Sequence, residues 1–302
     1  MIVNFDDFIL NERLGIGKDL ITISDFIYSL IINNPNNDFI INGDDIKTDK
    51  IIINKIYINK NKTNNIAEFN VQKSKMTDRG LIIYINFNSE SEIKSDVIFH
   101  EIQHALDIYY KGKDITSKQL FDIKCAKLAL NRMSDEKFKL FVQALYLSDI
   151  SEINSMTAES YKILSTILRQ KQDEKSIKDV FLVEYKKLDS YKAIQFLQNY
   201  NVYDLKKTDA NDLLMFFNII DDNYKHLLKY INYTFVDKIK LSIEGIKDVF
   251  FQQYKYKKMK KKYKKIEDVE RILKKYDKRF KKSADVLTKR IHRLLPLILE
   301  TE

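Results

Sequence analysis

The chain has 302 residues, of which 44% are hydrophobic and 31% are charged. These fractions are typical of a folded globular protein and exclude an intrinsically disordered one. The length allows one or two domains, and the scarcity of glycine and proline, with 6 and 2 residues, favours long regular helices.

Cysteine usage and hydropathy bear on the compartment of the chain. Cys125 is the one cysteine, which excludes an internal disulfide and fits a reducing compartment. It lies in an apolar helical pattern, so we expect it to be buried. The first residues, MIVNFDDFILNERLG, lack the regions of a signal peptide, and no segment has the roughly 18 consecutive apolar residues of a membrane span. We therefore expect a cytoplasmic chain without a transmembrane segment.

The net charge of +9 is concentrated at one end of the chain. Residues 253–302, which we call the basic segment, contain 18 Lys and Arg against 7 Asp and Glu, a net charge of +11, so the preceding 252 residues sum to −2. Aromatic residues are interleaved with its lysines, a pattern that can bind the phosphates and stacked bases of nucleic acid. It can equally bind an acidic protein or an anionic membrane surface, or form a solvated helix with one apolar face.

The first part of the chain predicts one helix and a small sheet. A helix over residues 24–33, capped by Ser24, is followed by the turn-forming sequence NNPNND. Three runs rich in β-branched and aromatic residues come next, over 50–59, 66–72 and 81–88. We expect these runs to form a small antiparallel sheet.

After residue 96 the apolar residues recur at helical spacing. The predicted helices cover 96–112, 118–133, 135–147, 151–170, 175–199, 210–230 and a last stretch from 236 to 293, before Pro296. The sequence therefore predicts an α+β fold, in which a small N-terminal sheet and the first of these helices precede an all-helical C-terminal part. We place the domain boundary at residue 170, which gives domains of 1–170 and 171–302.

His100, Glu101 and His104 form the motif H-E-x-x-H within the first of these helices. Histidines four residues apart project from the same face of a helix, so both imidazoles can bind one ion. Zinc accepts neutral imidazole nitrogen and, in a catalytic site, keeps one position for water. Glu101 can then act as the general base that activates the zinc-bound water for attack on a carbonyl. The motif predicts a Zn²⁺-dependent hydrolase.

A zinc site needs a third protein ligand, and the remaining histidines do not supply it. In the extended motif H-E-x-x-H-x-x-G-x-x-H, Asp107 stands in place of the glycine and Tyr110 in place of the third histidine. His226 and His292 lie far downstream, the latter between two arginines, and we expect neither to bind a cation. The third ligand is therefore expected to be acidic.

Glu152 and Glu159 lie seven residues apart in YLSDISEINSMTAESYK and share one face of the predicted helix. At this point the chain resembles the gluzincin type of zinc peptidase, in which H-E-x-x-H on one helix is completed by a glutamate on a later helix. That glutamate is commonly followed after two residues by a small one. Glu152-Ile-Asn-Ser matches this pattern, whereas Glu159-Ser-Tyr-Lys does not. The resemblance implies His100, His104 and Glu152 as metal ligands, with Glu159 as the alternative.

The segments HEIQHALD and YLSDISEIN are also similar to zincin-like proteins encoded by tailed phages. The resemblance implies that strand 81–88 is the edge strand above the metal, where an extended peptide can add to the sheet. Asp107 would then orient a ligand histidine, or else be an ordinary surface residue.

Two functions of different classes follow from these features. The first is a zinc metallopeptidase that cleaves a peptide or protein substrate. The second is a non-catalytic zincin-fold structural or binding protein, for example a phage virion component, whose basic segment binds a protein or nucleic acid. The first requires Glu101 for chemistry and the second does not.

Overall fold

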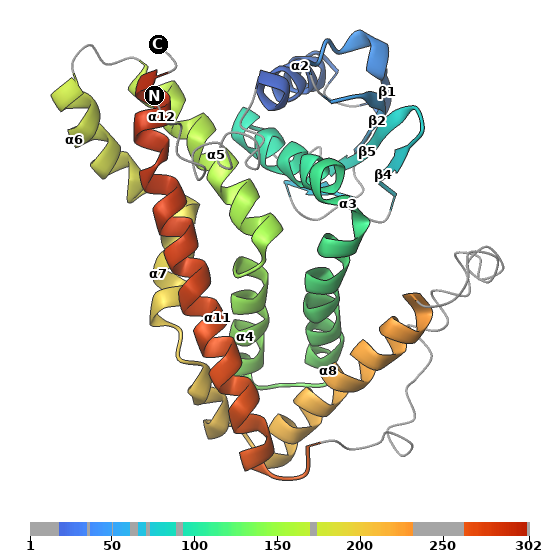
Figure 1. The fold of residues 1–302 in the computed structure, drawn as a ribbon, viewed down its shortest axis with the longest axis vertical. Helices are drawn as coiled ribbons and strands as arrows, with labels where there is room; N and C mark the ends of the chain where they lie inside the picture. Colours follow the sequence, from blue (N-terminus) through green and yellow to red (C-terminus); the bar gives the residue numbers. More distant parts are fainter. Residues whose placement is uncertain are drawn as a thin grey trace, which may run out of the picture. The chain divides into compact units, whose positions relative to one another are not determined.

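The computed structural model describes residues 18–34, 37–49, 51–60, 66–70, 73–88, 93–169, 174–231 and 263–300. A small N-terminal sheet of five strands is followed by helices, which make up most of the described chain (Figure 1). The predicted α+β fold class is therefore confirmed. None of the helices in these ranges combines the length and the apolar composition that a membrane span requires.

Contacts divide the chain into two compact units. The first unit consists of Met1–Thr116, Leu147–Asn199 and Lys281–Glu302, and the second of Ser117–Tyr146 and Tyr200–Phe280. Each unit thus contains residues from both sides of position 170.

The first described element is helix α2 (Lys18–Asn33), which begins before the predicted start at residue 24. Its buried face already includes Leu20 and continues through Ile23 and Ile27. Ser24, predicted as the helix cap, is instead buried inside the helix. The apolar periodicity, rather than the capping signal, therefore defines where this helix lies.

Five strands form one sheet in the first unit: β1 (Phe39–Asn42), β2 (Ile53–Lys60), β3 (Ala67–Phe69), β4 (Lys75–Thr77) and β5 (Gly80–Phe87). A short 3-10 helix, η1 (Gly43–Asp45), follows β1. The strand order is β1-β2-β5-β3, and β4 also pairs with β5. The three predicted strands correspond to β2, β3 and β5, whereas β1 and β4 are too short to show an alternating pattern.

The prediction of an antiparallel sheet is wrong for its central pair. β2 and β5 run parallel, with Ile56 opposite Ile83 and Ile58 opposite Ile85, while β1, β3 and β4 are each antiparallel to their neighbour. Parallel neighbours need a long connection, and the chain between β2 and β5 is long enough to contain two further strands.

The edge of the sheet also differs from the prediction. We expected strand 81–88 at the edge, but β5 lies inside the sheet, between β2 and β3. Its residues Leu81, Ile83, Ile85 and Phe87 are fully buried, as expected for an interior strand with a near-continuous apolar sequence. β3 is therefore the strand at this end of the sheet.

The remaining helices are α3 (Ser95–Leu130), α4 (Glu136–Leu147), α5 (Ile150–Leu168), α6 (Glu174–Tyr185), α7 (Asp189–Asn199), α8 (Ala210–Ile231), α11 (Ile266–His292) and α12 (Leu294–Glu300), with a 3-10 helix η2 (Val202–Lys207) before α8. α3 is continuous where two helices were predicted, because a single glycine at position 112 costs a helix only about 1 kcal/mol. The predicted helix 175–199 is instead divided into α6 and α7 by a turn that buries Leu188.

The last predicted helix, 236–293, is only partly described. Its residues up to 262 lie outside the described ranges, and α11 accounts for the rest. α11 ends at His292, within one residue of the predicted end, and a separate helix, α12, follows with Pro296 in its first turn. A proline is tolerated there because the first N–H groups of a helix have no partner within it.

The core of the first unit joins the sheet to α2, α3 and α5, with further apolar side chains from α6, α7, α11 and α12. Figure 1 shows α2 and the start of α3 beside the sheet. The second unit has an aromatic core, in which Phe141 of α4 contacts Phe216 and Phe217 of α8 and Phe280 of α11. Cys125 is buried, as predicted.

Candidate metal centre

The first turns of α3 carry the two histidines of the H-E-x-x-H motif. Ile98, Phe99 and Ile102 are fully buried in the core of the first unit, so this part of the helix is amphipathic as predicted. His100 and His104 are only half-buried, and their ring centroids lie 5.0 Å apart. The four-residue spacing thus places both imidazoles together on one face of α3.

The third member of the cluster is Glu152, in the first turn of α5. The helix is capped by Asp149, whose side chain accepts a hydrogen bond from the backbone N–H of Ser151. Glu152 is 6% exposed, and its Oε1 and Oε2 each lie 3.5 Å from a histidine Nε2, of His100 and His104 respectively. The carboxylate therefore lies between the two imidazoles.

The outer nitrogen of each imidazole has its own partner. His100 Nδ1 lies 3.0 Å from Glu159 Oε2, and because a carboxylate only accepts hydrogen bonds, the imidazole donates. His104 Nδ1 lies 3.0 Å from both Ser151 Oγ and Ser155 Oγ. Ser155 donates its hydroxyl proton to the Ser151 carbonyl, so it accepts from His104.

These outer hydrogen bonds leave both Nε2 atoms directed at Glu152. Glu159, which the sequence offered as an alternative ligand, contacts His100 at the nitrogen that faces away from Glu152. Sequence reasoning used Ser155 only as the small residue that follows Glu152, and it did not predict that Ser151 and Ser155 contact His104. The signal was present in S-E-I-N-S, where a serine precedes Glu152 and another follows it three residues later.

Glu101 is buried, at 9% exposed, and is held by the edge of the sheet. Its Oε2 accepts a hydrogen bond of 2.6 Å from the backbone N–H of Phe69 in β3. The Phe69 ring also stacks toward His104, with ring centroids 6.3 Å apart. A backbone donor has no sequence signature, so this contact of Phe69 could not be predicted from the sequence.

The donor set fits a zinc ion. Nitrogen and oxygen ligands at about 2.0–2.2 Å from a tetrahedral zinc ion lie about 3.4 Å from one another. The two distances of 3.5 Å between Glu152 and the histidines match this separation, and ligand atoms of all three residues lie within 4.8 Å of one another. Two imidazoles and one carboxylate are also the ligand types of catalytic zinc sites.

The charges of the cluster are strongly coupled. Burial opposes the charged form of His100, but hydrogen bonds and charge from Glu152, together with Glu159 and Glu101, outweigh it and raise the His100 pKa well above its ordinary value. Burial likewise disfavours the charged form of Glu152, yet the two histidines hold the Glu152 pKa below its ordinary range. Without metal, the cluster therefore holds a proton on His100 beside an ionised Glu152.

Zinc affinity is expected to fall as the pH falls. Because the His100 pKa is raised, the imidazole is protonated near neutral pH and must lose its proton to bind a metal, whereas Glu152 is already ionised. Zinc binding near pH 7 should therefore release about one proton from His100, and affinity should drop up to about tenfold per pH unit below the raised pKa. Calorimetric titrations in buffers of different ionisation enthalpy measure this release, and binding without any proton release would contradict it.

Replacing Glu159 with Gln is expected to weaken zinc binding without abolishing it. The amide can still contact His100 Nδ1, but it removes the charge that orients and polarises the imidazole. Loss of such an outer partner costs about 10- to 100-fold in metal affinity. Competition with a chromophoric chelator measures the dissociation constant, and Glu184→Gln at a half-buried glutamate of α6 is the matched control.

His292 and Asp107 do not belong to the group formed by His100, His104 and Glu152. The side chain of His292 is exposed, and its ring packs edge-on against Tyr185 at 5.5 Å. The side chain of His226 lies outside the described part of the chain. Asp107 is not a surface residue, because it is 1% exposed and accepts hydrogen bonds from Asn154 and Gln103.

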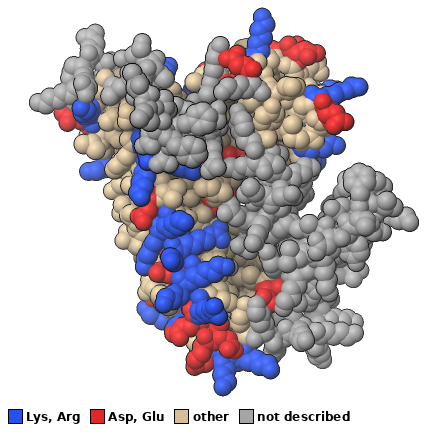
Figure 2. Space-filling view, viewed as in Figure 1, with Lys and Arg blue, Asp and Glu red and all other residues tan. Residues whose placement is uncertain are grey.

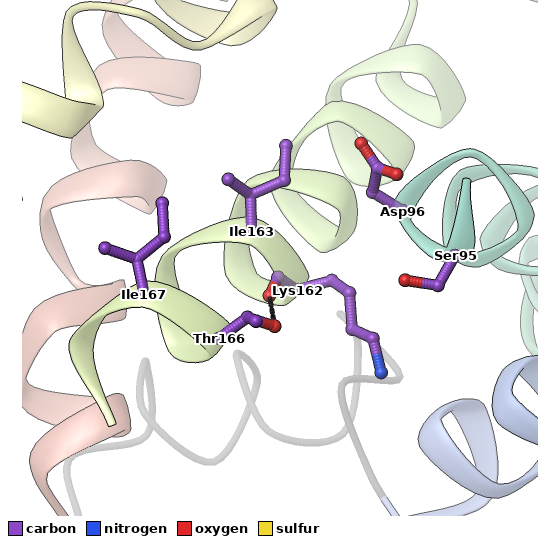
Figure 3. A pocket seen from close by; sticks show the side chains of 6 residues that line it. All are labelled: Ser95, Asp96, Lys162, Ile163, Thr166 and Ile167. Carbon is purple, nitrogen blue, oxygen red and sulfur yellow. Dashed lines mark hydrogen bonds between the residues drawn. The ribbon is translucent and has the colours of Figure 1, made fainter. Parts of the chain in front are cut away.

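A pocket of about 220 Å³ opens between the start of α3 and the second half of α5. It is one helical turn from the cluster, because Asp96 precedes His100 by four residues and Ile163 follows Glu159 by four. Figure 3 shows the residues that line it: Ser95, Asp96, Lys162, Ile163, Thr166 and Ile167. The Lys162 ammonium is paired with Asp25 at 2.6 Å, so Asp96 supplies the remaining charge of the lining.

Comparisons of the chain with protein-family models, curated proteins and solved structures found no match. The functional interpretation therefore rests on the geometry and chemistry of the site.

Proposed function

We propose that the protein is a zinc-dependent hydrolase of peptide bonds. The observation that supports this most directly is the convergence of His100 Nε2, His104 Nε2 and the Glu152 carboxylate at the spacing of zinc ligands. Glu101, adjacent to the first histidine in sequence, supplies the carboxylate that such chemistry requires.

In this proposal His100, His104 and Glu152 hold the ion and Glu101 moves the proton. A bound zinc ion supplies a Lewis acid, which lowers the pKa of water and polarises a carbonyl. Glu101 accepts the proton of the attacking water and later gives it to the leaving amine. The Phe69 N–H holds Glu101 Oε2, so the carboxylate keeps a fixed orientation while Oε1 takes part in proton transfer.

Two features beside the cluster favour a peptide as the substrate. β3 ends at Phe69, whose backbone contacts Glu101, and it lies at the edge of the sheet. An extended peptide can pair with such an edge and bring its carbonyl groups to the carboxylate. The pocket between α3 and α5 lies one turn from His100 and can receive a substrate side chain.

The proposed activity is tested by incubating the zinc-loaded protein with a complex mixture of peptides and identifying new termini by mass spectrometry. We expect cleavage that a chelator stops and that zinc restores. Peptides that stay intact with the zinc-loaded protein, over a wide range of sequences, would exclude the hydrolase and favour a binding role.

One observation favours that second role. Lysines on α11 are exposed, and Figure 2 shows Lys and Arg gathered along this helix. Such a face suits an anionic partner, either an acidic protein or nucleic acid. A binding role through this face predicts affinity for single-stranded nucleic acid or an acidic protein that falls steeply with added salt, and salt-independent binding would contradict it.

A further inference from the structure

A buried polar network lies beside the candidate metal centre and is not part of it. Its central residue is Asn154, two residues after the ligand Glu152 on α5, and 2% exposed. The Asn154 amide nitrogen donates to both carboxylate oxygens of Asp107 on α3, at 2.9 and 2.7 Å. Its amide oxygen accepts a hydrogen bond from the Arg290 guanidinium of α11. The network thus joins three helical segments of the first unit.

The chemistry of this network requires an amide at position 154. Asp107 only accepts hydrogen bonds and Arg290 only donates them, so the residue between them must offer a donor on one side and an acceptor on the other. Asp107 is 1% exposed, and a carboxylate buried this deeply is costly unless its oxygens are hydrogen-bonded. Gln103 also donates a hydrogen bond to it, at 3.2 Å.

The contacts of Glu152 and Asn154 with α3 fix the rotation of α5 about its own axis. Successive helical residues are about 100° apart, so Asn154 lies on nearly the opposite side of α5 from Glu152. Glu152 contacts His100 and His104 of α3, while Asn154 contacts Asp107 less than one turn further along the same helix. α3 therefore contacts α5 on two sides, and a rotation of α5 would break the Asn154 bonds as it moved Glu152 away.

We propose that Asn154 is a positioning residue, which couples Asp107 and Arg290 to the first turn of α5 and so holds Glu152 at the distance zinc requires from both histidines. The inference rests on the proposed metal centre and does not depend on hydrolysis. It assigns Asp107 a role in placing the helix of the third ligand, and it makes α11 a support of the metal centre.

The test is the zinc affinity of variants at both ends of the Asn154–Asp107 bond. Asn154→Asp places a carboxylate against Asp107, so the zinc dissociation constant should rise about 10- to 100-fold, as for other residues that orient metal ligands. The double variant Asp107→Asn, Asn154→Asp restores a donor opposite an acceptor and adds a direct ion pair with Arg290. We expect its dissociation constant to return to within about threefold of the original value, since charge-assisted hydrogen bonds replace the lost ones.

A control variant and spectroscopy distinguish a positioning role of Asn154 from a role in protein stability alone. Ser160→Ala removes a buried hydrogen bond of 2.8 Å between Ser160 of α5 and Ser190 of α7. It should lower the unfolding temperature of the metal-free protein and leave zinc affinity unchanged. The visible spectrum of the cobalt-substituted protein reports ligand geometry, so it should change for Asn154→Asp and stay unchanged for Ser160→Ala.

The zinc affinity and the cobalt spectrum of Asn154→Asp decide whether Asn154 positions Glu152. A folded Asn154→Asp variant with unchanged zinc affinity and an unchanged cobalt spectrum overturns it. If that variant does not fold, Arg290→Gln serves instead, with an expected rise in the dissociation constant of about three- to tenfold, and unchanged affinity again overturns it. If the unaltered protein binds no zinc, the inference fails together with the metal centre. Zinc binding without peptide cleavage refutes only the proposed hydrolase activity.

Discussion

Replacing Glu101 with Gln is expected to leave zinc bound and to lower the rate of peptide cleavage by about 10²- to 10⁴-fold, the contribution typical of a general base. The amide cannot accept a proton from water. It keeps an oxygen that can accept the Phe69 N–H, so the contact between α3 and β3 is preserved. The change therefore removes the proton acceptor and leaves the fold and the metal ligands in place.

Parallel measurements of zinc content and cleavage rate check this prediction. Glu184→Gln, at a half-buried glutamate of α6 that pairs with Lys187 at 2.6 Å, is the matched control and should change neither quantity. Cleavage at an unchanged rate by the Glu101→Gln variant would show that another group accepts the proton. Loss of zinc from this variant would place Glu101 among the metal ligands instead.

Replacing Glu152 with Ala is expected to weaken zinc binding by more than about 100-fold, beyond the effect typical of residues that only orient a ligand. Its carboxylate oxygens lie 3.5 Å from the Nε2 atoms of both histidines, so the change removes the third ligand and leaves two imidazoles. Metal-dependent cleavage should be lost with the metal.

The comparison of Glu152→Ala with Glu159→Gln decides between the two carboxylates. Chelator competition on both variants should show the larger loss for Glu152, because Glu159 contacts only the outer nitrogen of His100. A larger loss for Glu159→Gln than for Glu152→Ala would reverse the two assignments.

The fold class followed from sequence periodicity, and the errors arose where short elements and long-range pairing decide the structure. The apolar runs of β2 and β5 identified these strands, but nothing in them states that they pair in parallel. β5 lies between two neighbouring strands, and its near-continuous apolar sequence LIIYINF could have indicated an interior strand. The three-residue strand β4 was too short for a periodic pattern to identify it, and the run 66–72 that predicted β3 gave no sign that this strand forms the edge beside Glu101.

The candidate site was predictable where its residues lie on one helix. Once the segment is helical, the four-residue spacing of His100 and His104 places both on one face of α3, with Glu101 next to the first. Glu152 came from a resemblance, and the structure brings it to the two histidines. The contacts of Ser155, Phe69 and Asn154 depend on how α3, α5, α11 and the sheet pack against one another. That packing brings together residues far apart in the chain, so no local pattern in one sequence predicts it.

The most direct measurement of the metal centre is the zinc content of the natively purified protein, compared with that of a His100→Ala, His104→Ala double variant. About one zinc ion per chain is expected for the unaltered protein, as for a single site with three protein ligands, and almost none for the variant. Less than about 0.2 zinc per chain in the unaltered protein, or equal zinc in both proteins, would contradict the assignment of His100, His104 and Glu152 as a zinc site.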